Sequence, residues 1–253
     1  NRSFDVTCRG NTIAIVSDGS SAFGMGNIGP DAILPVLESK AVIMKNFAGV
    51  DALPIALKVD NVDDFVDTIL NLSPTFGAIS LEDIASPHGI AISNRLEKSS
   101  YIPVVNNHRD GVAIGVLAGL INAAKVVGKN LKEMRIIVHG AGTAGLGTAA
   151  ILRTYGVHEV IVSDRQGAIY HYRPHDMNWA KWEIAHNSNP NLEKGNLAEL
   201  LKGADAFIGL APSEIAVCDE IKNMAENPIV FTLASPLQFT PQEARKAGAA
   251  VVA

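Results

Sequence analysis

A glycine-rich turn in the middle of the chain has the spacing of a dinucleotide-binding site. Gly140, Gly142 and Gly145 form G-x-G-x-x-G directly after an apolar segment that predicts a β-strand. In such a turn the first glycine permits the tight bend, the second lets the backbone approach a pyrophosphate, and the third lets the next helix pack on the strand. The N–H groups of Thr143 and Ala144 would then face the phosphate charge at the helix start. We therefore predict that this turn binds a nicotinamide dinucleotide.

The next predicted strand carries the acid that such sites use for ribose. It ends at Asp164, whose carboxylate can accept hydrogen bonds from both ribose hydroxyls. This acid favours NAD, because it would repel a 2′-phosphate, whereas the adjacent Arg165 could bind one and keeps NADP as the alternative. A second glycine match, 24–29, begins eight residues after a predicted strand and lacks such an acid. We interpret it as a loop.

The elements that position these residues alternate between strands and helices. Amphipathic helical patterns lie between the strands, with helix starts marked by Asp60 or Asn61 and by a capping box from Thr240 to Glu243. This alternation predicts an α/β fold with parallel sheets. The apolar, β-branched segments that predict strands are Thr12–Val16, Gly77–Leu81, Ile102–Val105, Arg135–Val138, Val160–Ser163, Ala206–Gly209, Ile229–Leu233 and Ala250–Val252.

A long helical segment from Val112 to Lys129 separates two sets of strands. We therefore predict two domains, with the boundary just before this helix. Residues 1–108 would form an N-terminal open α/β domain that binds substrate and metal. Residues 109–253 would form a Rossmann-type NAD(P)-binding domain.

Composition narrows the class of protein. The chain has 253 residues, 47% of them hydrophobic, and a net charge of −5 without a basic stripe, which argues against nucleic-acid binding. The most apolar stretch is broken by Asn122 and Lys125, so we expect no membrane span. Cys8 and Cys218 fit no metal or redox spacing and are expected to be free thiols of a cytoplasmic protein, since no signal peptide is visible. Because the sequence begins at Asn1, we expect further residues at both ends.

Several motifs resemble those of bacterial malic enzymes, and the resemblance is collinear over essentially the whole chain. These motifs are Ile15–Gly19, Gly24–Pro30, Pro35–Ala41, Phe47–Ala52, Leu81–Ile84, the glycine turn, Ser163–Gly167 and Pro228–Phe231. Malic enzymes oxidise the 2-hydroxyl of malate with NAD(P) and then decarboxylate the product, with a divalent metal that polarises the carbonyl and stabilises the enolate. The resemblance implies this activity, a small 2-hydroxy acid as substrate, and a homodimer.

The resemblance also assigns residues of the first domain to the reacting centre. Lys40 matches the catalytic lysine, and burial in a cleft would lower its pKa so that it could accept the hydroxyl proton. Glu82 and Asp83 match two of three metal-binding carboxylates, whose oxygen ligands suit magnesium or manganese. By residue type alone, Lys40 fits a solvated helix position equally well, and the acid pair fits a helix cap.

The sequence departs from the family at three of these positions. Asn107, at a catalytic position, and His108, at the third metal ligand, stand where the family has consecutive aspartates. Ser235 replaces an asparagine that holds the nicotinamide and substrate. An imidazole in place of a carboxylate would weaken magnesium binding and favour manganese, iron or zinc. Asp110 could restore a carboxylate after a backbone shift, and Arg109 could bind a substrate carboxylate.

The function predicted first is NAD(P)-dependent oxidative decarboxylation of malate to pyruvate, with a modified metal site. The altered motifs leave two alternatives: a dehydrogenase repurposed for another 2-hydroxy acid, or a catalytically silent NAD-binding homologue. The family's catalytic tyrosine and a further substrate-binding asparagine are expected outside this sequence.

Overall fold

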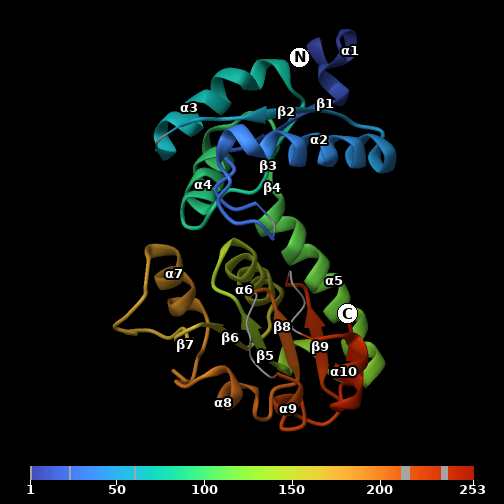
Figure 1. The fold of residues 1–253 in the computed structure, drawn as a ribbon, viewed down its shortest axis with the longest axis vertical. Helices are drawn as coiled ribbons and strands as arrows, with labels where there is room; N and C mark the ends of the chain where they lie inside the picture. Colours follow the sequence, from blue (N-terminus) through green and yellow to red (C-terminus); the bar gives the residue numbers. More distant parts are fainter. Residues whose placement is uncertain (1, 23, 60, 212–216, 235–238) are drawn as a thin grey trace. The chain divides into compact units, whose positions relative to one another are not determined.

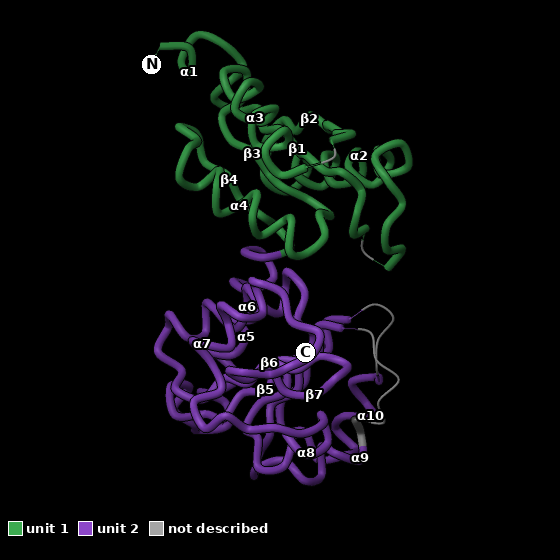
Figure 2. Tube along the Cα trace, turned by 90° about the vertical axis from the view of Figure 1, so that its left-hand side faces the viewer, with its two compact units in different colours: residues 1–108 green, residues 109–253 purple. Residues whose placement is uncertain are grey.

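The computed structural model describes residues 2–22, 24–59, 61–211, 217–234 and 239–253. The chain forms two compact units, Asn1–His108 and Arg109–Ala253, each with its own sheet (Figures 1 and 2). Both units alternate strands with helices. The prediction of an α/β protein with a Rossmann-type second half is confirmed.

The first unit is built on a four-stranded parallel sheet in the order β2-β1-β3-β4 (Figure 1). Its strands are β1 (Thr12–Ser17), β2 (Asp51–Ala56), β3 (Ala78–Leu81) and β4 (Val104–Asn106). The helices between them are α2 (Gly29–Ala48), α3 (Val62–Leu72) and α4 (His88–Ser99). Three further helical elements are short: α1 (Ser3–Val6), η1 (Cys8–Asn11) and η2 (Ser73–Thr75). Since all four strands are parallel, their carboxyl ends meet at one edge of the sheet.

Helices cover both faces of this sheet, as the alternation of side chains along β1 makes clear. Val16 packs in a cluster with Phe65 of α3 and Leu96 of α4. Its neighbour Ile15 points the other way and packs with Leu37 of α2. A parallel sheet buried on both faces has strands that are apolar at successive positions, which is why the sequence predicted β1.

No strand was predicted from the sequence at β2, a segment that contains Pro54. Proline has no backbone N–H and is normally excluded from strand interiors. In the structure β2 pairs only with β1, at the edge of the four-stranded sheet, where a missing donor on the open side is tolerated.

The second unit has a six-stranded sheet in the order β10-β9-β8-β5-β6-β7. The strands are β5 (Arg135–His139), β6 (Glu159–Asp164), β7 (Gly167–Ala168), β8 (Ala206–Gly209), β9 (Ile229–Thr232) and β10 (Val251–Val252), and only β7 is antiparallel. The segment η3 (Asn107–Gly111) crosses the boundary between the two units. The helical segments of the second unit are α5 (Val112–Val127), η4 (Leu131–Glu133), α6 (Thr143–Tyr155), α7 (Trp179–Asn187), α8 (Leu197–Leu201), α9 (Val217–Ile221) and α10 (Pro241–Lys246). The strand order reverses between β5 and β8, and open α/β sheets bind ligands at such a reversal.

Two predicted helix starts are confirmed. The Asn61 side chain accepts a hydrogen bond from the Asp64 N–H and caps α3, and Thr240 and Glu243 form the capping box of α10. Asp60, the alternative cap, lies outside the described residues.

The helical stretch Asn107–Val127 is long and apolar enough to cross a membrane when judged by length and composition alone. One side of α5 nevertheless packs inside the second unit, against α6 and β9. Val116 and Leu120 are buried, and a Cβ at Gly119 would come within 2.8 Å of the Phe231 ring. The helix is thus packed on its unit along one side, while Ile114 and Val126 are exposed.

Candidate functional site

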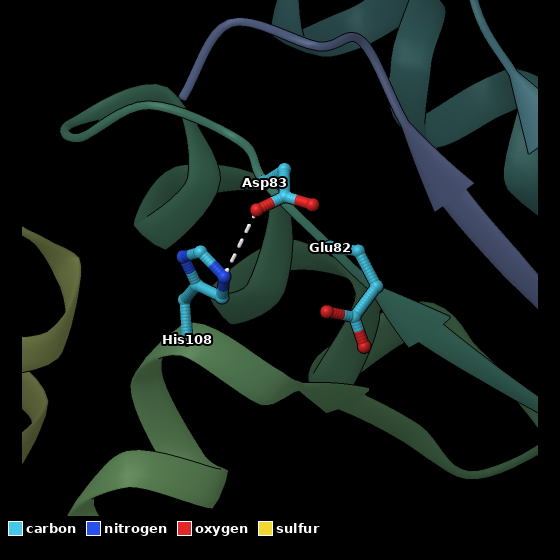
Figure 3. A group of neighbouring side chains, drawn as sticks. All are labelled: Glu82, Asp83 and His108. Atoms are coloured by element: carbon cyan, nitrogen blue, oxygen red, sulfur yellow. Dashed lines mark ion pairs between the residues drawn. The ribbon is translucent and has the colours of Figure 1, made fainter. Parts of the chain in front are cut away.

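Charged side chains from three elements meet at the carboxyl edge of the first sheet. Glu82 and Asp83 directly follow β3, His108 lies just after β4, and Lys40 comes from α2. Because β3 and β4 are adjacent parallel strands, residues that follow them are brought to the same edge. Figure 3 shows the imidazole of His108 facing Asp83, with Glu82 beside them.

The Lys40 ammonium bridges the two acids. Its Nζ donates to Glu82 Oε2 at 2.8 Å and to Asp83 Oδ2 at 2.7 Å, and both carboxylates are fully buried. Burial favours the neutral amine, but Glu82 and Asp83 outweigh it, so the pKa of Lys40 is raised above its ordinary value. The prediction of a lowered pKa is therefore wrong for this arrangement, because it took account of burial and not of the two adjacent charges.

Glu82, Asp83 and His108 have the composition and spacing of a metal site. One possible ligand atom from each residue lies within 4.8 Å of those of the other two. His108 Nε2 is 3.0 Å from Asp83 Oδ1, so the imidazole and this carboxylate are in direct contact. The donor set of two carboxylates and one imidazole fits a divalent metal.

The electrostatics of Asp83 favour its charged form. Burial alone would raise the pKa of Asp83, but His108 and Lys40 outweigh burial and hold the pKa below its ordinary value. Asp83 is therefore ionised at neutral pH.

Two polar side chains hold Glu82 in place. Ser80 Oγ donates to Glu82 Oε1 at 2.7 Å, and Asn107 Nδ2 donates to Glu82 Oε2 at 3.2 Å. Asn107 thus contacts a predicted metal ligand. Sequence reasoning missed Ser80, although its position two residues before Glu82 on the same strand face was a usable signal.

Arg109 and Asp110 form an ion pair at the start of the second unit. Arg109 Nε donates to Asp110 Oδ1 at 2.7 Å, and a second guanidinium nitrogen lies 3.4 Å from Oδ2. In this arrangement each group uses the other as a partner. The predicted alternatives, a replacement metal ligand and a substrate clamp, remain predictions.

The predicted dinucleotide turn joins β5 to α6. Gly140 has φ of +120°, and a Cβ there would lie 3.0 Å from the Ala211 backbone nitrogen. A Cβ on Gly145 would lie 1.7 Å from the Gly140 carbonyl oxygen, whereas one on Gly142 would meet nothing within 4 Å. The first and third glycines are thus required by packing, and space for a ligand adjoins the second.

The first turn of α6 is suited to an anion. Its N-cap is Gly142, and no side chain among the described residues caps it. The N–H groups of Thr143, Ala144 and Gly145 therefore lie at a helix start without a side-chain acceptor, which is the feature that binds a pyrophosphate.

Asp164 ends β6 as predicted and is held by two cations that sequence reasoning missed. Arg173 donates to both carboxylate oxygens at 2.9 and 3.0 Å, and Lys181 Nζ lies 2.8 Å from Oδ2. Burial would raise the pKa of Asp164, but Lys181 and Arg173 lower it further than burial raises it. Both cations come from the irregular segment 170–189, which has no motif to mark them.

Two other predicted cofactor-binding residues are placed as follows. Arg165 is exposed beside Asp164, and Ser235 lies outside the described residues.

A buried histidine adjoins the same turn. His139 is the last residue of β5, and its Nδ1 lies 2.9 Å from Ser163 Oγ on β6. The neighbouring backbone is also joined, since the Gly140 N–H donates to the Ser163 carbonyl at 2.8 Å. Burial lowers the pKa of His139, although the charge of Asp164 acts in the opposite direction.

This histidine is expected to make the second unit less stable in acid. The unfolded chain binds a proton at His139 below about pH 6.5, whereas the folded chain resists it, so the free energy of unfolding should fall as the pH drops below that value. Melting temperatures measured between pH 5 and 8 should show this loss for the wild type and a flatter profile for His139→Asn. His158→Gln, at an exposed position, is the control, and an unchanged profile in His139→Asn would rule out His139 as the cause.

Comparisons with known proteins agree on one family. The family profile "Malic enzyme, NAD binding domain" matches residues 110–250, and "Malic enzyme, N-terminal domain" matches residues 5–63. The chain is 44% identical over its full length to the bifunctional malic/malolactic enzyme of Bacillus subtilis, of which it covers 62%. It is 37% identical over 95% of its length to an NADP-dependent malic enzyme of Rhizobium meliloti, of which it covers 31%.

A solved structure gives the same result. The NAD-dependent malic enzyme of Thermotoga maritima is 39% identical, with a TM-score of 0.96 over 100% of this chain and 67% of that one. The chain thus spans less than two thirds of the length of the curated relatives described above. With both family profiles matching in order and the fold superposing throughout, the chain belongs to the malic enzyme family.

Proposed function

We propose that the protein containing this chain catalyses NAD-dependent oxidative decarboxylation of malate to pyruvate. The observation that carries the proposal is the meeting of Lys40, Glu82, Asp83 and His108 at one sheet edge. The first unit would bind the substrate and metal, and the second would bind the dinucleotide at the turn 140–145. The family resemblance further implies a homodimer.

Glu82, Asp83 and His108 would hold a divalent metal. When bound, the metal polarises the substrate carbonyl and stabilises the enolate, and the nicotinamide accepts the hydride. Because one donor is an imidazole nitrogen, we propose manganese ahead of magnesium as the ion. Ser80 and Asn107 would orient Glu82 through the hydrogen bonds described above.

Lys40 would accept the proton of the 2-hydroxyl group. While its ammonium bridges both acids it is charged and has no lone pair to offer. It must therefore leave at least one carboxylate and lose a proton before it can act as a base.

In the second unit, the uncapped start of α6 would hold the pyrophosphate, and Asp164 would accept the ribose hydroxyls. Arg173 and Lys181 offset the charge of Asp164. We therefore expect a preference for NAD over NADP that is smaller than an unpaired acid would give.

The direct test is turnover by the full-length protein. With malate and NAD, NADH should form only when a divalent metal is added, pyruvate should accumulate in equal amount, and NADP should support a lower rate. Absence of NADH with malate across magnesium, manganese, iron and zinc would contradict the proposal. In that case NADH formed from another 2-hydroxy acid would indicate a repurposed dehydrogenase, and NAD binding without turnover would indicate a silent homologue.

The variant His108→Asp tests whether the altered residue is a metal ligand. It restores an all-oxygen donor set, so the metal dependence should move towards magnesium relative to manganese. An unchanged ratio of magnesium to manganese affinity, measured by calorimetry, would mean that His108 does not contact the metal.

A further inference from the structure

Asp83 has a left-handed backbone conformation, which is uncommon for a residue that carries a side chain. Its φ is +53°, in the left-handed region, and its side chain is fully buried. This conformation costs an L-residue about 1 kcal/mol or more. Since the backbone angle sets the direction of the side chain, whatever holds the angle also aims the carboxylate.

The loop after β1 holds the backbone that follows the Cα of Asp83. The N–H of Ser21 donates to the Asp83 carbonyl at 2.9 Å. The N–H of Ala85 donates to Ser20 Oγ at 2.8 Å. Both contacts join residues more than sixty positions apart, so they depend on the placement of this loop against the end of β3.

Asp18 fixes the orientation of the Ser20 hydroxyl. Ser20 Oγ donates to Asp18 Oδ1 at 2.6 Å, and the Ser20 N–H donates to the same oxygen at 2.9 Å. A hydroxyl has one proton, and once that proton is given to a carboxylate the oxygen lone pairs are left for a donor. The Ala85 N–H is that donor.

Gly19 holds the loop against the start of α2. It has φ of +70°, and a Cβ there would lie 2.2 Å from the Gly29 carbonyl oxygen. The N–H groups of Ile28 and Gly29 both donate to the Gly19 carbonyl. The loop therefore has little freedom to move away from Asp83.

We propose that Asp18 and Ser20 are positioning residues that aim the carboxylate of Asp83 at the metal, an inference that rests on the proposed function. Neither side chain is itself a member of the three-residue ligand group. Both act through the backbone of residues 83–85. Hydrogen bonds that orient a metal ligand typically change metal affinity by about 10- to 100-fold.

The test is manganese affinity of the metal-depleted full-length protein, followed by the electron paramagnetic resonance signal of free Mn²⁺. Ser20→Ala should raise the Mn²⁺ Kd by about tenfold or more. Ser20→Thr, which retains the hydroxyl, should restore most of the affinity, and Asp18→Ala should resemble Ser20→Ala. At saturating Mn²⁺, kcat of Ser20→Ala should stay near the wild-type value, because the ligands themselves are intact.

The controls separate positioning from general loss of structure. Ser39→Ala removes a hydroxyl that donates within α2, to the Pro35 carbonyl, and should leave the Kd unchanged. A wild-type Kd in Ser20→Ala, or an equal loss in Ser20→Thr, would overturn the inference while leaving the proposed function in place. If Ser20→Ala does not fold, Asp18→Asn, which retains an acceptor oxygen, should bind Mn²⁺ more tightly than Asp18→Ala, and equal affinities would overturn it. A wild-type protein that binds no Mn²⁺ would overturn this inference, and malate turnover with the other metals would then decide the proposed function.

Discussion

Replacing Lys40 by alanine is expected to lower kcat for malate oxidation by about 10³-fold, within the range for loss of a general base. Lys40 is the described amine that contacts both acids of the candidate metal site. Its removal takes away the group proposed to accept the hydroxyl proton, while Glu82, Asp83 and His108 remain. The measurement is steady-state NADH formation at saturating metal, malate and NAD. The KM for NAD should change little.

Lys45→Ala is the matched control for this change. Lys45 lies on the same helix and also pairs with an acid, Asp51, but both side chains are more than half exposed. This variant should keep wild-type activity. Lys40→Ala should also lose about 2 kcal/mol of unfolding free energy without metal, a value below that of a fully buried pair because 23% of the lysine side chain is exposed. A Lys40→Ala enzyme within tenfold of the wild-type kcat would exclude this lysine as the base.

The second large effect is expected at the dinucleotide turn. Gly145→Ala places a Cβ within 1.7 Å of the Gly140 carbonyl oxygen, a backbone atom that cannot give way without moving the turn. We expect a loss of roughly 1–3 kcal/mol of unfolding free energy and a rise in the Kd for NADH of roughly 100-fold. Thermal denaturation and NADH fluorescence titration measure the two effects.

Gly142→Ala separates an effect on NADH binding from an effect on the stability of the fold. A Cβ at this position has open space in the protein, so stability should change by less than about 0.5 kcal/mol. NADH affinity should still fall by about tenfold, since the methyl group would occupy the space proposed for the pyrophosphate. If Gly142→Ala binds NADH like the wild type, the proposed position of the phosphates is wrong.

The elements of the second unit could be predicted well because their signals are local. The centre of β5 and nearly all of β8 are apolar, since both faces of the sheet are covered, and the glycine pattern specifies a single kind of turn. The strands that sequence reasoning missed, β2 and β7, are edge strands that carry a proline or consist of two residues. Edge strands have fewer sequence constraints because one side is unpaired.

The candidate site was less predictable because its chemistry depends on residues distant in sequence. The roles of Lys40, Glu82 and Asp83 were predicted from the family resemblance. The charge on the lysine, in contrast, follows from its pairing with acids more than forty positions away in the sequence. The same holds for Asp164, whose partners Arg173 and Lys181 lie in a segment without regular periodicity. No local pattern encodes such contacts.

The proline in β2 also affects whether the sheet of the first unit can pair with strands of other chains. An open strand edge offers a row of N–H and C=O groups that can act as a template for intermolecular pairing and aggregation. In the four-stranded sheet one edge, β2, contains Pro54, and the other, β4, has only three residues. Both edge strands are therefore poor templates, which protects the sheet from addition of a strand of another chain at either edge.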